Sequence, residues 1–374
     1  MLDTEEFIET QANFQFGTCK APPGLDIEAL AIREASTRPS FALHNTVTGA
    51  FVPADRGFGI SKRDDQWMVD FGDKKVDTAK RLKAGRKANV LSDLYGLGLR
   101  VPVLLDMNDA ARWPNAFPAF QYNRLNGAPN SVLWPLRRVH QIGAQGFVSL
   151  PNSAEPTLRQ KKPCLFWRGS LRGFTRGNPP RSITGLIRRH LAGRMSREDL
   201  LHRLATVSRY IFVSRHFGDE GFDVGFSSQH DKPYMMDVPE IKCLAKGHVP
   251  PSDQLACRYL ISIGGTDVAS SFGWQLGTHS VILRESYAYE VFFDCHFRPW
   301  EHYVPIGSDF SDVAQKIDWC EEHLDECQQM IDRRHALIPL LLNEEVRREA
   351  LRRVVESYTA FYTRGNYQLR LGTS

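Results

Sequence analysis

The sequence predicts an α/β fold of two domains. The chain has 374 residues, which exceeds the length at which a single hydrophobic core usually stops growing. Hydrophobic residues make up 42% of it, so there is enough apolar material to fill such cores. Short apolar runs that are typical of buried strands alternate with stretches of helical periodicity. This alternation favours a largely parallel sheet.

The first predicted elements are a helix and a strand. Residues 77–93 have helical periodicity, and the apolar run 101–105 predicts a short buried strand. The basic face of the helix comprises Lys80, Arg81, Lys83, Arg86 and Lys87. Residues 110–160 are rich in proline and are expected to form loops, so we place the domain boundary between residues 157 and 158.

Further strands are predicted beyond this boundary. They cover residues 163–167, 210–214, 259–263 and 280–283. Two helices are then expected to close the chain, with Ser311 as the N-cap of the first and Asn343 as the N-cap of the second. The second helix covers residues 344–362 and carries an apolar stripe that comprises Val346, Ala350, Val354, Tyr358 and Phe361.

Charge and cysteine content limit the function classes. The formal net charge of +4 is too small to indicate nucleic-acid binding by itself, but it suits an enzyme that handles an anionic, phosphorylated small molecule. The seven cysteines are scattered, without a C-x-x-C pair, so neither a disulfide framework nor a structural zinc site is expected. The N-terminal residues lack the pattern of a signal peptide, and no apolar stretch reaches the ~20 residues of a membrane span. We therefore expect a cytoplasmic protein with reduced thiols.

A glycine- and arginine-rich segment follows the predicted strand 163–167. Its sequence over 166–181 is FWRGSLRGFTRGNPPR, and its arginines are Arg168, Arg172, Arg176 and Arg181. Glycine lets backbone N–H groups approach a ligand closely, and the guanidinium fork of arginine matches phosphate oxygens. The segment is therefore a candidate diphosphate cradle. A solvated basic loop and an RNA-binding Arg-Gly segment remain alternatives, because three Arg-Gly pairs recur every four residues.

Two further segments follow predicted strands. Residues 264–272, with the sequence GGTDVASSF, come after the strand 259–263, and small hydroxyl residues at such a turn can bind an anion. Asp106 and Asp109 come after the strand 101–105, where open α/β sheets place their ligands. Either carboxylate could act as a general base, whereas a capping or loop carboxylate is the alternative. Asp106 is near enough to the strand end to accept from backbone N–H groups of the turn.

Several short motifs, taken in order, resemble glycosyltransferase family 90. This family includes Rumi-type protein O-glucosyltransferases, capsule xylosyltransferases and bacterial lipopolysaccharide-modifying relatives. The clearest stretch is RPWEHYVPI at 298–306, which is similar to the K-P-x-x-H-Y-I/V-P-V motif of the family, with the helix start 308–313 behind it. Other matching segments are 105–109, Trp134-Pro135, 166–170, 257–261 and 268–272. The resemblance covers about residues 95–335.

The resemblance implies a GT-B architecture of two Rossmann-like domains. Residues 1–157 would bind the acceptor, 158–335 would bind the nucleotide sugar, and 336–374 would carry a helix that packs back on the first domain. The implied reaction is inverting transfer of a glucose- or xylose-type sugar from a UDP-sugar to a hydroxyl of a glycan or other acceptor. Asp109 is implied as the general base. The implied donor-binding residues are Arg168, Gly169, Ser170, Arg176, Arg181, Ser270, Ser271 and Phe272.

The resemblance also implies the partners and the cofactors. A UDP-sugar and a glycan acceptor are the expected partners, nucleic acid is not, and a lipid-linked acceptor would bring the protein to a membrane surface. Synthesis of a bacterial surface polysaccharide is the expected setting. GT-B enzymes usually need no metal, and the sequence offers neither a D-x-D motif in a suitable place nor histidines at metal-ligand spacing. We therefore expect no cofactor.

Two departures from the family pattern keep another function open. The family often has Asp-Gly where this chain has Gly264-Gly265, and an arginine that contacts the diphosphate where it has Gly273-Trp274. Arg168, Arg176 or Arg181 could replace that arginine. A catalytically inactive protein that binds a sugar nucleotide or a glycan is therefore the first alternative, and the RNA-binding protein is the second.

Overall fold

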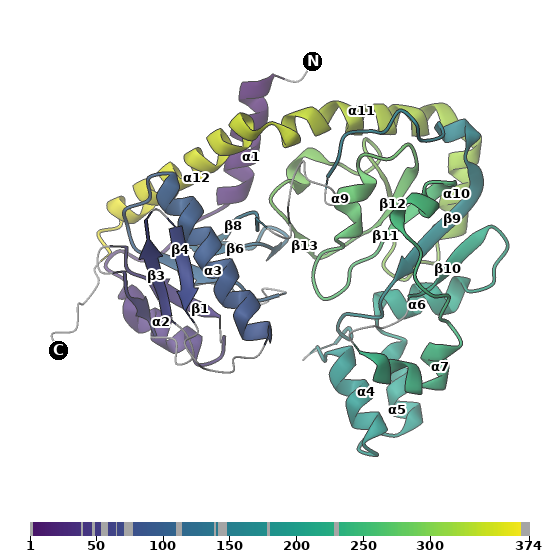
Figure 1. Ribbon diagram of the computed structural model, residues 1–374, viewed down its shortest axis with the longest axis horizontal. Helices are drawn as coiled ribbons and strands as arrows, with labels where there is room; N and C mark the ends of the chain where they lie inside the picture. The colour runs from purple at the N-terminus through teal and green to yellow at the C-terminus, as the bar shows by residue number, and fades with distance from the viewer. Residues whose placement is uncertain are drawn as a thin grey trace. The chain divides into compact units, whose positions relative to one another are not determined.

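The chain forms two compact units, each built around a five-stranded sheet (Figure 1). The computed structural model describes residues 3–38, 40–46, 49–53, 59–64, 66–70, 78–109, 114–137, 140, 148–177, 180–227 and 232–367. The first unit comprises residues 1–141, 288–296 and 340–374, and the second comprises 142–287 and 297–339. Helices and parallel strands in these units confirm the predicted α/β class.

The sheet of the first unit is mixed. Its strand order is β2-β1-β5-β6-β8. The central strand β5 (Val103–Asp106) is antiparallel to β1 (Phe41–His44) and parallel to β6 (Ala119–Gln121). The outer strands are β2 (Phe51–Val52), antiparallel to β1, and β8 (Ser131–Leu133), parallel to β6. All four residues of β5 are buried, as expected for the apolar run from which this strand was predicted.

Short strand pairs and helices complete the described part of the first unit. The pairs are β3 (Gly59–Arg63) with β4 (Gln66–Asp70), and β7 (Arg124–Leu125) with β13 (Tyr289–Glu290). The helices are α1 (Thr4–Phe16), α2 (Ile27–Ala35), α3 (Thr78–Gly96) and α12 (Glu344–Arg364). Asp77 and the side chain of Lys80, which the helix prediction included, lie outside the described residues. As predicted, Asn343 caps α12, because its Oδ1 accepts from the N–H groups of Glu345 and Val346.

The sheet of the second unit is entirely parallel, with the order β10-β9-β11-β12-β14. These strands are β9 (Lys162–Gly169), β10 (Phe222–Phe226), β11 (Cys257–Ser262), β12 (Val281–Glu285) and β14 (Val304–Ile306). Numbered along the chain within this unit, the order is 2-1-3-4-5, which is a doubly wound arrangement. In such sheets the strand order reverses between the first and third strands, and ligands bind outside the carboxyl ends of these strands. That position lies here between β9 and β11.

The helices of the second unit correct two predictions. They are α4 (Ile183–Leu191), α5 (Arg197–Leu204), α6 (Ser208–His216), α7 (Pro239–Lys242), α8 (Pro251–Gln254), α9 (Ser271–Gln275), α10 (Val313–Glu322) and α11 (Leu324–Leu342). The strand predicted at 210–214 is wrong, because these residues belong to α6; a short apolar run alone does not distinguish a strand from a buried helix. The N-cap of α10 is Asp312 and not Ser311. Short 3₁₀ turns lie at Leu158–Gln160, Pro233–Asp237 and Asp294–His296.

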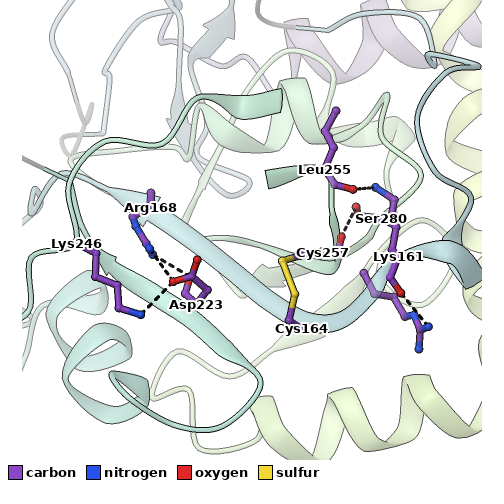
Figure 2. Close-up of a disulfide and its surroundings, with 9 residues drawn as sticks. Lys161, Cys164, Arg168, Asp223, Lys246, Leu255, Cys257 and Ser280 are labelled. Atoms are coloured by element: carbon purple, nitrogen blue, oxygen red, sulfur yellow. Dashed lines mark hydrogen bonds and ion pairs between the residues drawn. A yellow bond between two sulfur atoms is a disulfide. The ribbon is translucent and has the colours of Figure 1, made fainter. Parts of the chain in front are cut away.

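A disulfide joins Cys164 on β9 to Cys257 on β11, which corrects the expectation of reduced thiols (Figure 2). The two residues are 93 positions apart in the sequence, but the parallel pairing of their strands brings their Cα atoms to 5.2 Å. Spacing within the sequence could not reveal this pair. The other five cysteines are free. No helix in the described part of the chain has the length and apolar character that crossing a membrane requires.

Candidate functional site

The carboxyl ends of β9 and β11 bring two predicted segments together. Strand β9 ends at Gly169, so the part of the glycine- and arginine-rich segment from Ser170 onwards follows it directly. Strand β11 ends at Ser262, so residues 264–272 follow that strand. Because the two strands are parallel neighbours, both segments leave the sheet at the same edge. This edge is the candidate ligand site of the second unit.

Arg209 on α6 fixes the two segments to each other. Its Nη1 donates to the carbonyl of Ser170 at 2.8 Å, its Nη2 to that of Ile263 at 3.2 Å, and its Nε to that of Gly264 at 3.1 Å. Burial lowers the pKa of Arg209, an effect opposed by the nearby Tyr287 and Glu285. Arg209 was not among the predicted site residues, because an isolated arginine has no local signature and part of its helix was predicted as a strand.

Close packing explains the two glycines after β11. A Cβ atom on Gly264 would lie 1.9 Å from the ring of Tyr287. The hydroxyl of that tyrosine donates to the carbonyl of Gly265 at 3.3 Å. The N–H of Gly264 donates to Oε2 of the buried Glu285 at 2.9 Å. An aspartate in place of Gly264 would overlap Tyr287, so the departure from the Asp-Gly pattern of the family follows from the packing here.

Arg168 lies within the sheet and not on the loop that follows it. Its side chain is only 6% exposed, and its Nη2 is 2.7 Å from Oδ1 of Asp223 on β10. Lys246 contacts the same carboxylate oxygen at 3.0 Å, so two cations share one carboxylate (Figure 2). Burial raises the pKa of Asp223, but the hydrogen bonds and charges of Arg168 and Lys246 outweigh it, and the pKa is lowered. This arrangement gives Arg168 a structural partner in the absence of a ligand.

The other predicted arginines are placed differently. Arg176 donates to Ser208 Oγ at 3.1 Å and to the carbonyl of Ser308, and lies 3.7 Å from Glu285. Its side chain is 42% exposed, so it could also contact a ligand. Arg172 donates to Ser170 Oγ at 3.1 Å. The side chain of Arg181 is exposed, and its backbone pairs with Thr175. The partners of Arg172 and Arg176 favour a built cradle over an RNA-binding Arg-Gly segment.

The predicted donor loop contacts an arginine from the neighbouring strand. Ser271 Oγ lies 3.5 Å from Ser262 Oγ at the end of β11. Ser271 is the first residue of α9, and Ser270 is the N-cap of this helix. The guanidinium carbon of Arg284 on β12 lies 3.9 Å from the ring centroid of the buried Phe272. Arg284 therefore lies against this loop, and Gly273, the residue after the loop, stands where the resembled family pattern has an arginine. Arg284 was not among the residues predicted from the sequence.

The first unit holds the two candidate aspartates at the carboxyl end of β5. Asp106 is buried, and its Oδ1 accepts from the backbone N–H of Asn108 at 3.2 Å and from Ser40 Oγ at 3.1 Å. Its Oδ2 lies 3.9 Å from the buried Arg38. The predicted bond of Asp106 to the backbone of the turn is therefore confirmed.

Asp109 differs from Asp106 in exposure and partners. Its side chain is 49% exposed, and its Oδ1 accepts from Arg86 Nη1 at 2.7 Å and from the Tyr122 hydroxyl at 2.5 Å. Burial raises the pKa of Asp109, but the hydrogen bonds from Tyr122 and Arg86 outweigh it, and the pKa lies below its ordinary value. Asp109 is therefore an accessible carboxylate that is ionised at neutral pH.

Metal ligands do not gather in the described residues. No group of three or more histidine, cysteine, aspartate or glutamate side chains that could hold an ion occurs in that part of the chain. The groups that do gather at the edge of the second sheet include arginine guanidinium groups and serine hydroxyls. Such groups suit an anionic ligand.

Comparison with known proteins finds similarity to one family over part of the chain. Residues 229–361 match the model of glycosyl transferase family 90. Protein O-glucosyltransferase 2 of Danio rerio is 32% identical over 83 residues, which is 22% of this chain and 17% of that protein. Protein O-glucosyltransferase 3 of Rattus norvegicus is 30% identical over 73 residues, 20% of this chain and 14% of that protein. O-glucosyltransferase LpsA of Dichelobacter nodosus is 29% identical over 101 residues, 27% of this chain and 29% of that protein.

The second unit is thus a doubly wound α/β fold, and its candidate site lies at the point where the strand order reverses. The segment 229–361 is similar to glycosyltransferase family 90, the family that the sequence motifs predicted. It contains β11, β12, β14 and the loop 264–272, and so one side of the candidate site. The aligned segments span less than a third of the length of the three relatives.

Proposed function

We propose that this chain is an inverting glycosyltransferase of GT-B architecture. It transfers a glucose- or xylose-type sugar from a UDP-sugar to a hydroxyl of a glycan or another acceptor. The observation that carries the proposal is the position of the family segment: its loop 264–272 lies beside Gly169 and Ser170 where a doubly wound sheet binds its ligand. In this proposal the second unit binds the donor, and Asp109 in the first unit is the general base.

The charge of the leaving diphosphate accounts for the arginines at this edge. A nucleoside diphosphate gains negative charge as it leaves, and donors that are already fixed stabilise this charge without reorganising. Arg172, Arg176 and Arg284 are the proposed phosphate partners, since the first two belong to the glycine- and arginine-rich segment and Arg284 contacts Phe272 of the loop 264–272. Arg284 takes the part of the arginine that the family pattern places after Ser271-Phe272.

A thermal-shift screen tests the donor class. UDP-glucose, UDP-xylose and UDP-galactose are compared with UDP and with an unrelated nucleotide such as AMP. A ligand present at about 100 times its Kd stabilises the native state by about 2.7 kcal/mol, which raises the melting temperature measurably. We expect UDP and at least one UDP-sugar to raise it. A melting temperature unchanged by every UDP compound would contradict the proposed donor.

Replacing Arg209 with lysine is expected to weaken UDP binding by about 10- to 100-fold, the equivalent of one or more charge-assisted hydrogen bonds. One ammonium group cannot satisfy the carbonyls of Ser170, Ile263 and Gly264 as the guanidinium does, so the two segments lose their fixed spacing. Isothermal titration calorimetry with UDP measures the change. Arg215→Lys, an exposed position on the same helix, is the matched control. Equal UDP affinity in both folded variants would show that Arg209 does not shape the site.

We also propose that transfer needs no divalent metal and takes place in the cytoplasm, on a precursor of a bacterial surface polysaccharide. In this proposal arginines supply the positive charge that a metal ion supplies in metal-dependent transferases. Activity should therefore be unchanged after dialysis against EDTA. Loss of activity in EDTA with recovery on adding Mn²⁺ would contradict the metal-free mechanism.

An inactive binding protein is the second candidate function, because Gly273 and Trp274 stand where the family pattern has the arginine that contacts the diphosphate. Such a protein would be stabilised by a UDP-sugar but would release no UDP from it, with or without an acceptor. An assay of UDP release therefore separates the two functions.

A further inference from the structure

The two oxygens of the Asp109 carboxylate have different surroundings. Both hydrogen bonds to this side chain, from Arg86 and from Tyr122, end on Oδ1. Among the described residues, no donor contacts Oδ2. Since the side chain is 49% exposed, Oδ2 is the oxygen that an approaching hydroxyl can reach.

We infer that Tyr122 and Arg86 are positioning residues that hold Oδ1 of Asp109, so that Oδ2 receives the proton of the acceptor hydroxyl. The inference rests on the proposed function, in which Asp109 is the base. In that step the acceptor O–H bond breaks and the Oδ2–H bond forms. The acceptor oxygen bonds to the anomeric carbon as the bond from that carbon to the diphosphate oxygen breaks, and its electron pair leaves with the nucleoside diphosphate.

The two donors come from different elements that are themselves fixed. Arg86 lies on α3, and its Nη1 also donates to the carbonyl of Met107 at 3.3 Å. Tyr122 follows β6 directly and is only 4% exposed, and the guanidinium carbon of Arg86 lies 4.8 Å from the centroid of its ring. Asp109 itself lies outside any helix or strand. Anchoring a loop carboxylate from a helix and a strand end gives it the fixed orientation that proton transfer requires.

The charges around Asp109 favour its ionised form. From α3, Arg86 donates to it, and Lys83, which donates to Asn108 Oδ1 at 2.9 Å, adds a second positive charge. His140, whose ring centroid is 6.2 Å from that of Tyr122, adds no charge at neutral pH, because burial lowers its pKa to about 3. The carboxylate is therefore ready to accept a proton before the acceptor arrives. Removing the Tyr122 hydroxyl takes away a hydrogen bond to the ionised form, so the pKa of Asp109 should rise.

The test compares Tyr122→Phe with Tyr95→Phe. Both variants lose one buried or half-buried tyrosine hydroxyl of the first unit, but that of Tyr95 donates to the carbonyl of Thr46 and does not contact Asp109. The first readout is the pH dependence of UDP release from UDP-glucose. The second is the carboxyl carbon-13 titration of Asp109, assigned by its absence in Asp109→Asn, which needs no turnover. Arg86→Lys serves as a second variant.

We expect the acidic limb of the rate profile and the titration of Asp109 to move to higher pH in Tyr122→Phe and Arg86→Lys, but not in Tyr95→Phe. The kcat on the plateau should fall about tenfold, as for the loss of one charge-assisted hydrogen bond, with the KM for UDP-glucose unchanged. If Asp109→Asn is inactive while the profile and titration of Tyr122→Phe match those of the wild type, Tyr122 does not position Asp109. Asp109 then remains the proposed base. Full activity of Asp109→Asn would overturn the proposed base, and this inference with it.

Discussion

Substitution of Asp109 by asparagine is expected to lower transfer by at least ~10²-fold, because removal of a general base usually costs this much. Asparagine keeps the size of the side chain and can still accept hydrogen bonds from Arg86 and Tyr122 at its amide oxygen. It cannot accept the proton of the acceptor hydroxyl. Donor binding should be unchanged, since the donor segments belong to the second unit. UDP release with acceptor, and UDP affinity by calorimetry, measure the two effects separately.

Asp106→Asn is the matched control for this experiment. Asp106 is buried and bonded to Ser40, Asn108 and Gln121, so its substitution should lower the free energy of unfolding without removing a proton acceptor from the surface. Wild-type turnover in Asp109→Asn, with a folded but inactive Asp106→Asn, would transfer the role of base to Asp106. Full activity in both variants would refute the proposed mechanism.

Local patterns were sufficient to predict the strands that carry the site. The strands β5, β9 and β11 contain apolar runs with polar residues or glycine at their carboxyl ends, as expected for strands in the interior of a sheet. The same kind of pattern gave a wrong prediction at α6. The apolar run 210–213 was predicted as part of a strand, but it belongs to a helix. Its buried residues, Phe212 and Val213, face the core of the second unit, whereas Ser214 and Arg215 are exposed.

Pairs between distant segments could not be predicted in the same way. Arg86 and Tyr122 reach Asp109 from α3 and from the end of β6, and Arg284 reaches Phe272 from the next strand. The disulfide between Cys164 and Cys257 is a pair of the same kind. Each contact depends on strand order and register, which short-range periodicity does not determine. The motifs identified the segments of the candidate site, but the topology decides which side chains meet there.

Replacing Arg334 with methionine is expected to lower the free energy of unfolding by about 3–5 kcal/mol, the range for breaking a buried charged interaction. Arg334 lies on α11 with its side chain wholly buried. It donates to the carbonyls of Leu276, Thr278, Ser280 and His302. Burial lowers its pKa to about 9, so the guanidinium remains charged at neutral pH. Methionine keeps much of the volume, but it removes all of these guanidinium donors, and a buried carbonyl that finds no other donor costs about 1–3 kcal/mol.

The segment that Arg334 holds leads from α9 into β12, which carries Arg284 and Glu285. Urea unfolding at pH 7 measures the stability change, and Arg333→Met is the control, because the neighbouring Arg333 is exposed and donates only to Gln329 on its own helix. Arg333→Met should change the free energy of unfolding by less than about 0.5 kcal/mol, as exposed substitutions usually do. UDP stabilises only the native state, so it should recover part of the stability of Arg334→Met if the donor site still forms. A stability of Arg334→Met within 1 kcal/mol of the control would show that water or a shift of the segment satisfies these carbonyls, and that Arg334 does not hold the segment in place.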